Sequence, residues 1–165
     1  MARPNPLRSI MEAPLPSLTY QRQKQFRPSH ADITYAYNLI NRQVFKNQLR
    51  RPKLTMGRVG RAWGTCQWYY SEQTPGTFCD LWIADKWFCQ QWFINVLAHE
   101  MVHQWQWDIY RWDHESCYGK AMPVHSAGHG PSFFSWRDEF DYYGLSLKGW
   151  FRTKKWFLYQ DFARC

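Results

Sequence analysis

The sequence lacks several features that would assign its class directly. No apolar run reaches the ~18 residues that a membrane-spanning helix needs, so no membrane contact is expected. The first 18 residues hold four prolines and no continuous apolar stretch, which argues against a secretory signal. We therefore expect a cytoplasmic or nucleoid-associated protein or, for a phage-encoded chain, one of the host cytoplasm or the virion.

Paired cysteines are also missing, because none of the five cysteines belongs to a CxxC motif. A cysteine zinc site normally needs such close pairs. With an odd number of cysteines and no secretory signal, the prediction is that all five are reduced thiols, most of them buried.

Acidic residues are absent from residues 33–70, where seven Lys and Arg residues stand. Residues 1–61 carry 12 basic and 2 acidic side chains, residues 62–147 carry 4 and 10, and residues 148–165 carry 5 and 1. The net charges of these segments are therefore +10, −6 and +4. This asymmetry favours contact with a polyanion, most often nucleic acid, although a solvated basic surface explains it equally well.

What the chain does contain is enough apolar material for one folded domain. Of 165 residues, 45% are apolar and 19% are aromatic, so the core is expected to be built largely from rings. Five of the nine prolines lie in residues 1–28, which predicts an extended basic arm that is ordered only where a partner holds it. The expected organisation is this arm, a domain over residues 29–147, and a basic aromatic tail over residues 148–165.

Apolar periodicity predicts a mixed α+β domain with a small antiparallel sheet. Ser29 is a plausible N-cap for the first helix, with Asp32 three residues later. Pro131 suits the first turn of the last helix. The expected helices are residues 30–46, 86–111 and 131–144, and the expected strands are residues 53–59, 61–70 and 77–84, with a turn over residues 72–76.

The longest predicted helix is apolar except for one stripe of polar residues. Gln91, Asn95, His99 and His103 are spaced four apart, so they stack on one helical face. Residues 99–103 read HEMVH, an HExxH motif, in which two imidazoles one turn apart can ligate a single Zn²⁺. Glu100 is placed to take a proton from a water on that metal without ligating it, which would give a nucleophile at neutral pH.

The third metal ligand is not fixed by spacing. The metzincin pattern is excluded because Gln106 and Ile109 occupy the positions of its glycine and third histidine. His129 is favoured because flanking glycines allow the backbone to approach a metal closely. The alternatives left open are His114, His125 and Glu139.

Beyond these single residues, the chain resembles the SprT-like (Spartan-type) metallopeptidase domain over about residues 33–147. The resemblance implies that His99, His103 and His129 bind zinc, that Glu100 is the catalytic base, and that the fold is a minimal zincin-like one with the sheet packed on the HExxH helix and two further helices. The C-terminal zinc ribbon of many members is missing. The matching pieces are residues 41–45 with Leu49 and Pro52, Gly64-Thr65-Cys66, residues 99–105, residues 129–133 and Gly144-Leu145.

The resemblance implies a zinc-dependent peptidase acting on proteins on or near DNA, with the basic segments contacting DNA. Rings could also stack unpaired bases, but at strand spacing they more often belong to the core. One alternative is a structural or adaptor component of an assembly, such as a phage particle, in which a partner holds the arm. A weaker alternative is a non-proteolytic nucleic-acid-binding protein. The rings in question are Trp63, Trp68, Tyr69 and Tyr70.

Overall fold

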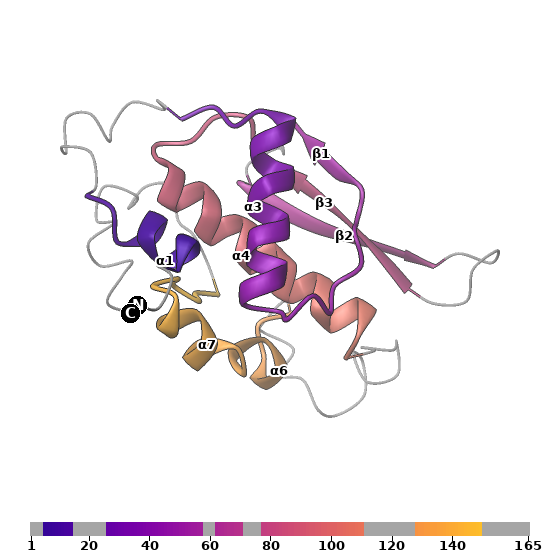
Figure 1. Ribbon diagram of the computed structural model, residues 1–165. Coiled ribbons are helices and arrows are strands. Elements are labelled where there is room, and N and C mark those ends of the chain that lie inside the picture. Colours follow the sequence, from indigo (N-terminus) through magenta and orange to yellow (C-terminus); the bar gives the residue numbers. More distant parts are fainter. Residues whose placement is uncertain (1–4, 15–25, 58–61, 71–76, 111–127, 150–165) are drawn as a thin grey trace.

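The computed structural model describes residues 5–14, 26–57, 62–70, 77–110 and 128–149, with only the backbone described for residues 68–70, 77 and 78 (Figure 1). The predicted turn at residues 72–76, Cys117, Cys165 and most of the C-terminal tail lie outside this part of the chain. None of the helices in the described ranges is both long enough and apolar enough to cross a membrane.

Helix α3 (His30–Gln43) begins at the predicted N-cap. The Ser29 hydroxyl accepts a hydrogen bond from the backbone N–H of Asp32, and the Asp32 carboxylate accepts one from the backbone N–H of Ser29 at 2.8 Å. This capping box satisfies two N–H groups that a helix start otherwise leaves unpaired. The apolar face of α3, which includes Ile33, Tyr37 and Ile40, is buried.

The sheet has three strands in the order β1-β3-β2: β1 (Leu54–Met56), β2 (Gly64–Tyr70) and β3 (Thr77–Ile83). Strands β2 and β3 pair antiparallel, but β1 runs parallel to β3, so the prediction of a wholly antiparallel sheet is wrong. The central place falls to β3, whose alternate residues Cys79, Leu81 and Ile83 are all buried. Strand β3 therefore pairs with both β1 and β2, and these two strands form the edges of the sheet.

Helix α4 (Gln90–Asp108) packs on β2 and β3 and is buried on almost every side. In Figure 1 helix α3 crosses in front of it, and the two helices are in contact. It begins later than predicted because Trp87 forms an antiparallel bridge with Phe26, with N···O distances of 3.0 and 2.8 Å between their backbones. The extended Trp87 carries a fully buried ring into the core.

The predicted last helix is divided into α6 (Pro131–Phe134) and α7 (Arg137–Tyr142). Pro131 starts α6, as predicted. At the break, the Ser135 hydroxyl donates to the carbonyl of Ser132 at 2.7 Å, a local bond of the kind that competes with helix continuation. The Trp136 ring at this break packs against the rings of Phe45 and Trp105.

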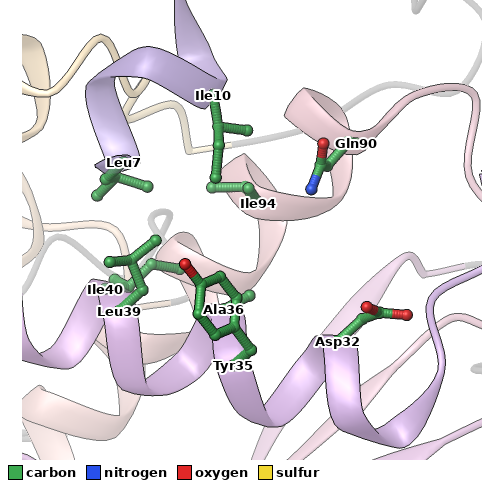
Figure 2. Close-up of a pocket in the computed structure, with 9 residues that line it drawn as sticks. All are labelled: Leu7, Ile10, Asp32, Tyr35, Ala36, Leu39, Ile40, Gln90 and Ile94. Atoms are coloured by element: carbon green, nitrogen blue, oxygen red, sulfur yellow. The ribbon is translucent and has the colours of Figure 1, made fainter. Parts of the chain in front are cut away.

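The N-terminal segment is not extended throughout, which corrects the prediction for residues 6–11. These residues form a short helix, α1 (Pro6–Met11), capped by the side chain of Asn5. Leu7 is fully buried, and α1 packs against α3. Figure 2 shows Leu7 and Ile10 of α1 around a small hollow that α3 and α4 also line. At least this part of the segment is therefore held by the protein itself.

The cysteine prediction is also wrong for two residues. Cys66 on β2 and Cys79 on β3 form a disulfide. They occupy neighbouring diagonal positions, because Cys66 pairs with Leu81 and Cys79 pairs with Trp68 in the sheet register. Positions two apart on one strand face the same side of a sheet, so the hairpin brings these two thiols together. Cys89 is a buried free thiol, as predicted.

Candidate metal centre

Three histidine side chains from two parts of the chain converge at one point. His99 and His103 lie one turn apart on α4, and their Nε2 atoms are 3.2 Å apart. His129 lies just before α6, and its Nε2 is 3.1 Å from each of the other two Nε2 atoms. The three residues form a group whose geometry could hold a metal ion.

The backbone around His129 explains how it reaches α4. Gly128 has a φ of 93°, a left-handed conformation that residues with a side chain rarely adopt. Gly130 is the N-cap of α6, and Pro131 starts the helix. The fully buried Phe133 ring packs against the imidazoles of all three histidines, with centroid distances of 4.6 to 4.9 Å. The buried Phe133 ring thus supports the three imidazole rings from the side of the core.

The donor set fits a tetrahedral metal. A tetrahedral ion with metal–nitrogen bonds of about 2.0–2.1 Å places its ligand atoms about 3.3 Å apart. The observed Nε2 separations of 3.1 to 3.2 Å are close to that distance between ligand atoms. Among the described residues no fourth His, Cys, Asp or Glu joins the group. The three imidazoles would fill three of the four positions of a tetrahedral ion.

Burial keeps the two helical imidazoles in the form that binds metal. The pKa of His99 lies well below its ordinary value, chiefly because of burial and then because of the neighbouring His103 and His129, while a backbone hydrogen bond with Lys148 opposes this effect. Burial also lowers the pKa of His103 to about 4, and a hydrogen bond with Gln106 opposes it. Both rings are therefore neutral at neutral pH, as metal ligation requires.

Glu100 is buried but lies outside the ligand group. Its side chain contacts β2: a Cβ added to Gly64 would lie 2.9 Å from Glu100 Cγ. Burial raises the pKa of the Glu100 carboxyl to about 8, while a backbone hydrogen bond from Cys66 favours the ionised form. Without a cation nearby the carboxyl is therefore largely protonated at pH 7, and a bound Zn²⁺ would favour the carboxylate, which is the form that can accept a proton. Gly64 is needed here because strand β2 passes so close to the carboxyl.

Gln106 belongs to this site, although the sequence pattern gave it no role there. It is fully buried, and its Oε1 lies 2.9 Å from Nδ1 of His103. Its Nε2 donates to the carbonyl of Gly128 and to the hydroxyl of Ser132, each at 2.9 Å. The available clue was its position three residues after His103, which places it on the same helical face.

The segment formed by residues 145–149 runs along the same side of α4, which the sequence did not indicate. The backbone N–H of Ser146 donates to Asn95 Oδ1 at 2.7 Å. A Cβ added to Gly149 would lie 3.6 Å from Cγ of His129. Residues 148 and 149, assigned to the tail from sequence, therefore lie against the site.

The remaining candidates are placed elsewhere or not described. Glu139, the alternative carboxylate ligand, forms an ion pair with Lys46 and does not join the histidine group. His114 and His125 lie outside the described residues. Trp63 is buried against the rings of Trp87, Phe88 and Trp92, so it belongs to the core and is not a surface for stacking bases. The side chains of Trp68, Tyr69 and Tyr70 are not described.

The predicted basic surface is partly neutralised within the protein. Of the seven basic residues between 33 and 70, Lys46 pairs with Glu139, and Arg50 pairs with Asp108 at 3.0 Å. Arg58 and Arg61 lie outside the described residues. The charge available for a polyanion in this part of the chain is therefore smaller than the sequence count.

Comparison of the chain with protein-family models, with curated proteins and with solved structures finds no match.

Proposed function

We propose that this protein is a zinc-dependent metallopeptidase of the SprT-like type that hydrolyses peptide bonds in proteins on or near DNA. The observation that carries the proposal is the convergence of three imidazole Nε2 atoms, 3.1 to 3.2 Å apart, with the buried Glu100 next to them in sequence but outside the ligand group. This division of roles supports a catalytic site. A purely structural zinc site uses four protein ligands and has no need of a base.

The residues of the chain have distinct roles in this proposal. His99, His103 and His129 would hold the metal through Nε2. Bound Zn²⁺ supplies a Lewis acid that makes water nucleophilic at neutral pH. The carboxylate of Glu100 accepts the proton of the attacking water and returns it to the leaving amine. The backbones of Gly64 and Cys66 keep this carboxylate in place.

The substrate class is supported by charge and by the resemblance of the motifs. The ends of the chain carry net charges of +10 over residues 1–61 and +4 over residues 148–165, whereas the part with the histidine cluster carries −6. A catalytic region of negative charge between basic ends would direct phosphates toward the ends and leave the site open for protein.

The test is proteolysis of a basic DNA-binding protein with and without single-stranded DNA, comparing wild type with Glu100→Gln. Loss of the base should lower kcat by about 10²–10⁴-fold while zinc content stays at one per chain. The matched control is Glu139→Gln, which removes a carboxylate that pairs with Lys46 outside the cluster and should leave cleavage unchanged.

The other outcomes separate the alternatives. No cleavage by wild type with one zinc bound per chain would favour the structural or adaptor component of an assembly. Binding of DNA that weakens steeply with salt, with no effect of Glu100→Gln in any assay, would favour the nucleic-acid-binding protein.

A further inference from the structure

The hydrogen bonds of Gln106 fix the orientation of its own side-chain amide. The carbonyl oxygen of Gly128 can only accept a hydrogen bond, so the group that faces it at 2.9 Å must be the NH₂ of Gln106. The amide oxygen is then left facing Nδ1 of His103, also at 2.9 Å. No other assignment of the amide satisfies both contacts, because a carbonyl–carbonyl pair would repel.

This orientation in turn fixes the tautomer of His103. An amide oxygen only accepts, so Nδ1 of His103 must carry the hydrogen and donate it. A neutral imidazole with its hydrogen on Nδ1 has a lone pair on Nε2. That Nε2 is the atom that faces His99 and His129 at 3.2 and 3.1 Å.

We infer that Gln106 is the positioning residue of the metal site, holding His103 in the metal-binding tautomer and anchoring the segment that carries His129 through the same amide. The inference rests on the metal site of the proposed function but not on peptidase activity. Contacts of this kind to ligand histidines orient the ring and raise its basicity toward a metal.

The second half of this role depends on the residues that flank His129. The NH₂ of Gln106 binds the carbonyl of Gly128, which precedes His129, and the hydroxyl of Ser132, which follows it in α6. Helix α4 is thereby connected to both sides of the third ligand. Gly128 has a left-handed φ, and a glycine has many other backbone conformations open to it. This hydrogen bond therefore also helps to hold Gly128 in the observed conformation.

The chain provides a matched control two residues away. Gln104 is also on α4, is also fully buried, and also uses both ends of its amide. Its Nε2 donates to the carbonyl of Arg50 and to the carboxylate of Asp108, and its Oε1 accepts from the hydroxyl of Tyr37. None of these partners belongs to the histidine cluster, so Gln104 separates the cost of losing a buried amide from the loss of ligand positioning.

The experiment compares Gln106→Met with Gln104→Met in the full-length chain. Zn²⁺ affinity is measured by competition with a chromophoric chelator, and the tautomer of His103 is read from imidazole ¹⁵N chemical shifts of the metal-free protein. Gln106→Met should weaken Zn²⁺ binding by about 10–100-fold and remove the preference for the Nδ1–H form. Gln104→Met should lower the melting temperature without changing either readout.

A third variant separates the two roles of the amide. In Gln106→Glu the carboxylate can still accept from Nδ1 of His103 but cannot donate to Gly128. The Nδ1–H tautomer should therefore persist, while Zn²⁺ affinity falls because His129 is less well held.

Equal losses of Zn²⁺ affinity in Gln106→Met and Gln104→Met would overturn the inference. If Gln106→Met does not fold, the wild-type spectrum still decides: His103 with its hydrogen on Nε2 in the metal-free protein contradicts the assignment. Wild type that binds Zn²⁺ and has the expected tautomer but cleaves no protein would leave the inference standing and remove the proposed function.

Discussion

Gln91 and Asn95 in the first half of α4 hydrogen-bond to protein backbone, whereas His99 and His103 in the second half face other imidazoles. Gln91 Nε2 donates to the carbonyl of Ala13, and Asn95 Oδ1 accepts from the N–H of Ser146. In the second half, the Nε2 atoms of His99 and His103 lie 3.2 Å apart. The first half of this polar stripe therefore binds the backbone of other segments, and the second half forms a candidate metal site.

The two halves of the stripe differ in the hydrogen-bonding groups that their side chains carry. Amides carry both donors and acceptors, so Gln91 and Asn95 can satisfy the backbone of segments that arrive from elsewhere in the chain. The three imidazoles instead turn their Nε2 atoms toward one another, an arrangement that could hold a cation. Substitutions in the two halves should therefore have different consequences.

The largest contrast is expected between His99→Ala and Asn95→Ala. His99→Ala removes one of three ligands and should weaken Zn²⁺ binding by more than about 10³-fold, because two imidazoles alone hold zinc poorly. Asn95→Ala should leave Zn²⁺ affinity intact but lower the free energy of unfolding by about 1–3 kcal/mol, because the buried N–H of Ser146 loses its acceptor. Chelator competition and urea denaturation measure the two effects. Equal Zn²⁺ affinities in both variants would refute the division of the stripe.

A second contrast concerns the strand that packs on the second half of α4. The Cys66–Cys79 disulfide closes a loop with a sequence separation of 13, which corresponds to a stabilisation of about 3 kcal/mol. The double variant Cys66→Ser, Cys79→Ser should lose this stability in urea denaturation.

The disulfide itself is checked by alkylation of the denatured, unreduced wild type followed by peptide mapping. Cys89 should be labelled and should act as the internal control, since it is a free thiol. Labelling of Cys66 and Cys79 without prior reduction would contradict the disulfide and restore the expectation drawn from the cysteine count.

The smallest effect is expected from adding a single Cβ to strand β2, next to Glu100. Gly64→Ala would place a methyl group 2.9 Å from Glu100 Cγ and 3.1 Å from Val96 Cγ1, so it should lower stability by about 1–3 kcal/mol and displace the Glu100 carboxylate. Gly57→Ala is the control, because nothing lies within 4 Å of the added Cβ. Peptidase assays and thermal melts of both variants give the answer. A Gly64→Ala variant with unchanged peptidase kcat would show that β2 does not position Glu100.

Features encoded within one element were predicted well. The capping box of Ser29 and Asp32, the start of α6 at Pro131 and the location of His99 and His103 on one helical face all follow from spacings of three or four residues. Such spacings fix neighbours through the geometry of the helix itself. The coarse α+β class followed in the same way from apolar periodicity.

Features that depend on contact between elements were predicted poorly. The parallel pairing of β1, the Cys66–Cys79 disulfide and the docking of α1 through Leu7 each join segments whose own patterns do not report their partner. The start of α4 was missed for the same reason, since the bridge between Phe26 and Trp87 keeps Trp87 out of the helix.

By itself the sequence determined that two imidazoles and a carboxylate lie on one turn of a mostly apolar helix, because α-helical geometry places residues i and i+4 together. It left four candidates for the third ligand and gave no role to Gln106. The tertiary structure brings His129 to the pair and connects it to His103 through the Gln106 amide. The two contacts that reach the segment of His129 join residues 26 and 22 positions apart in the chain. They exist only once α4 and α6 have packed around Phe133, since no periodicity within either element specifies the other.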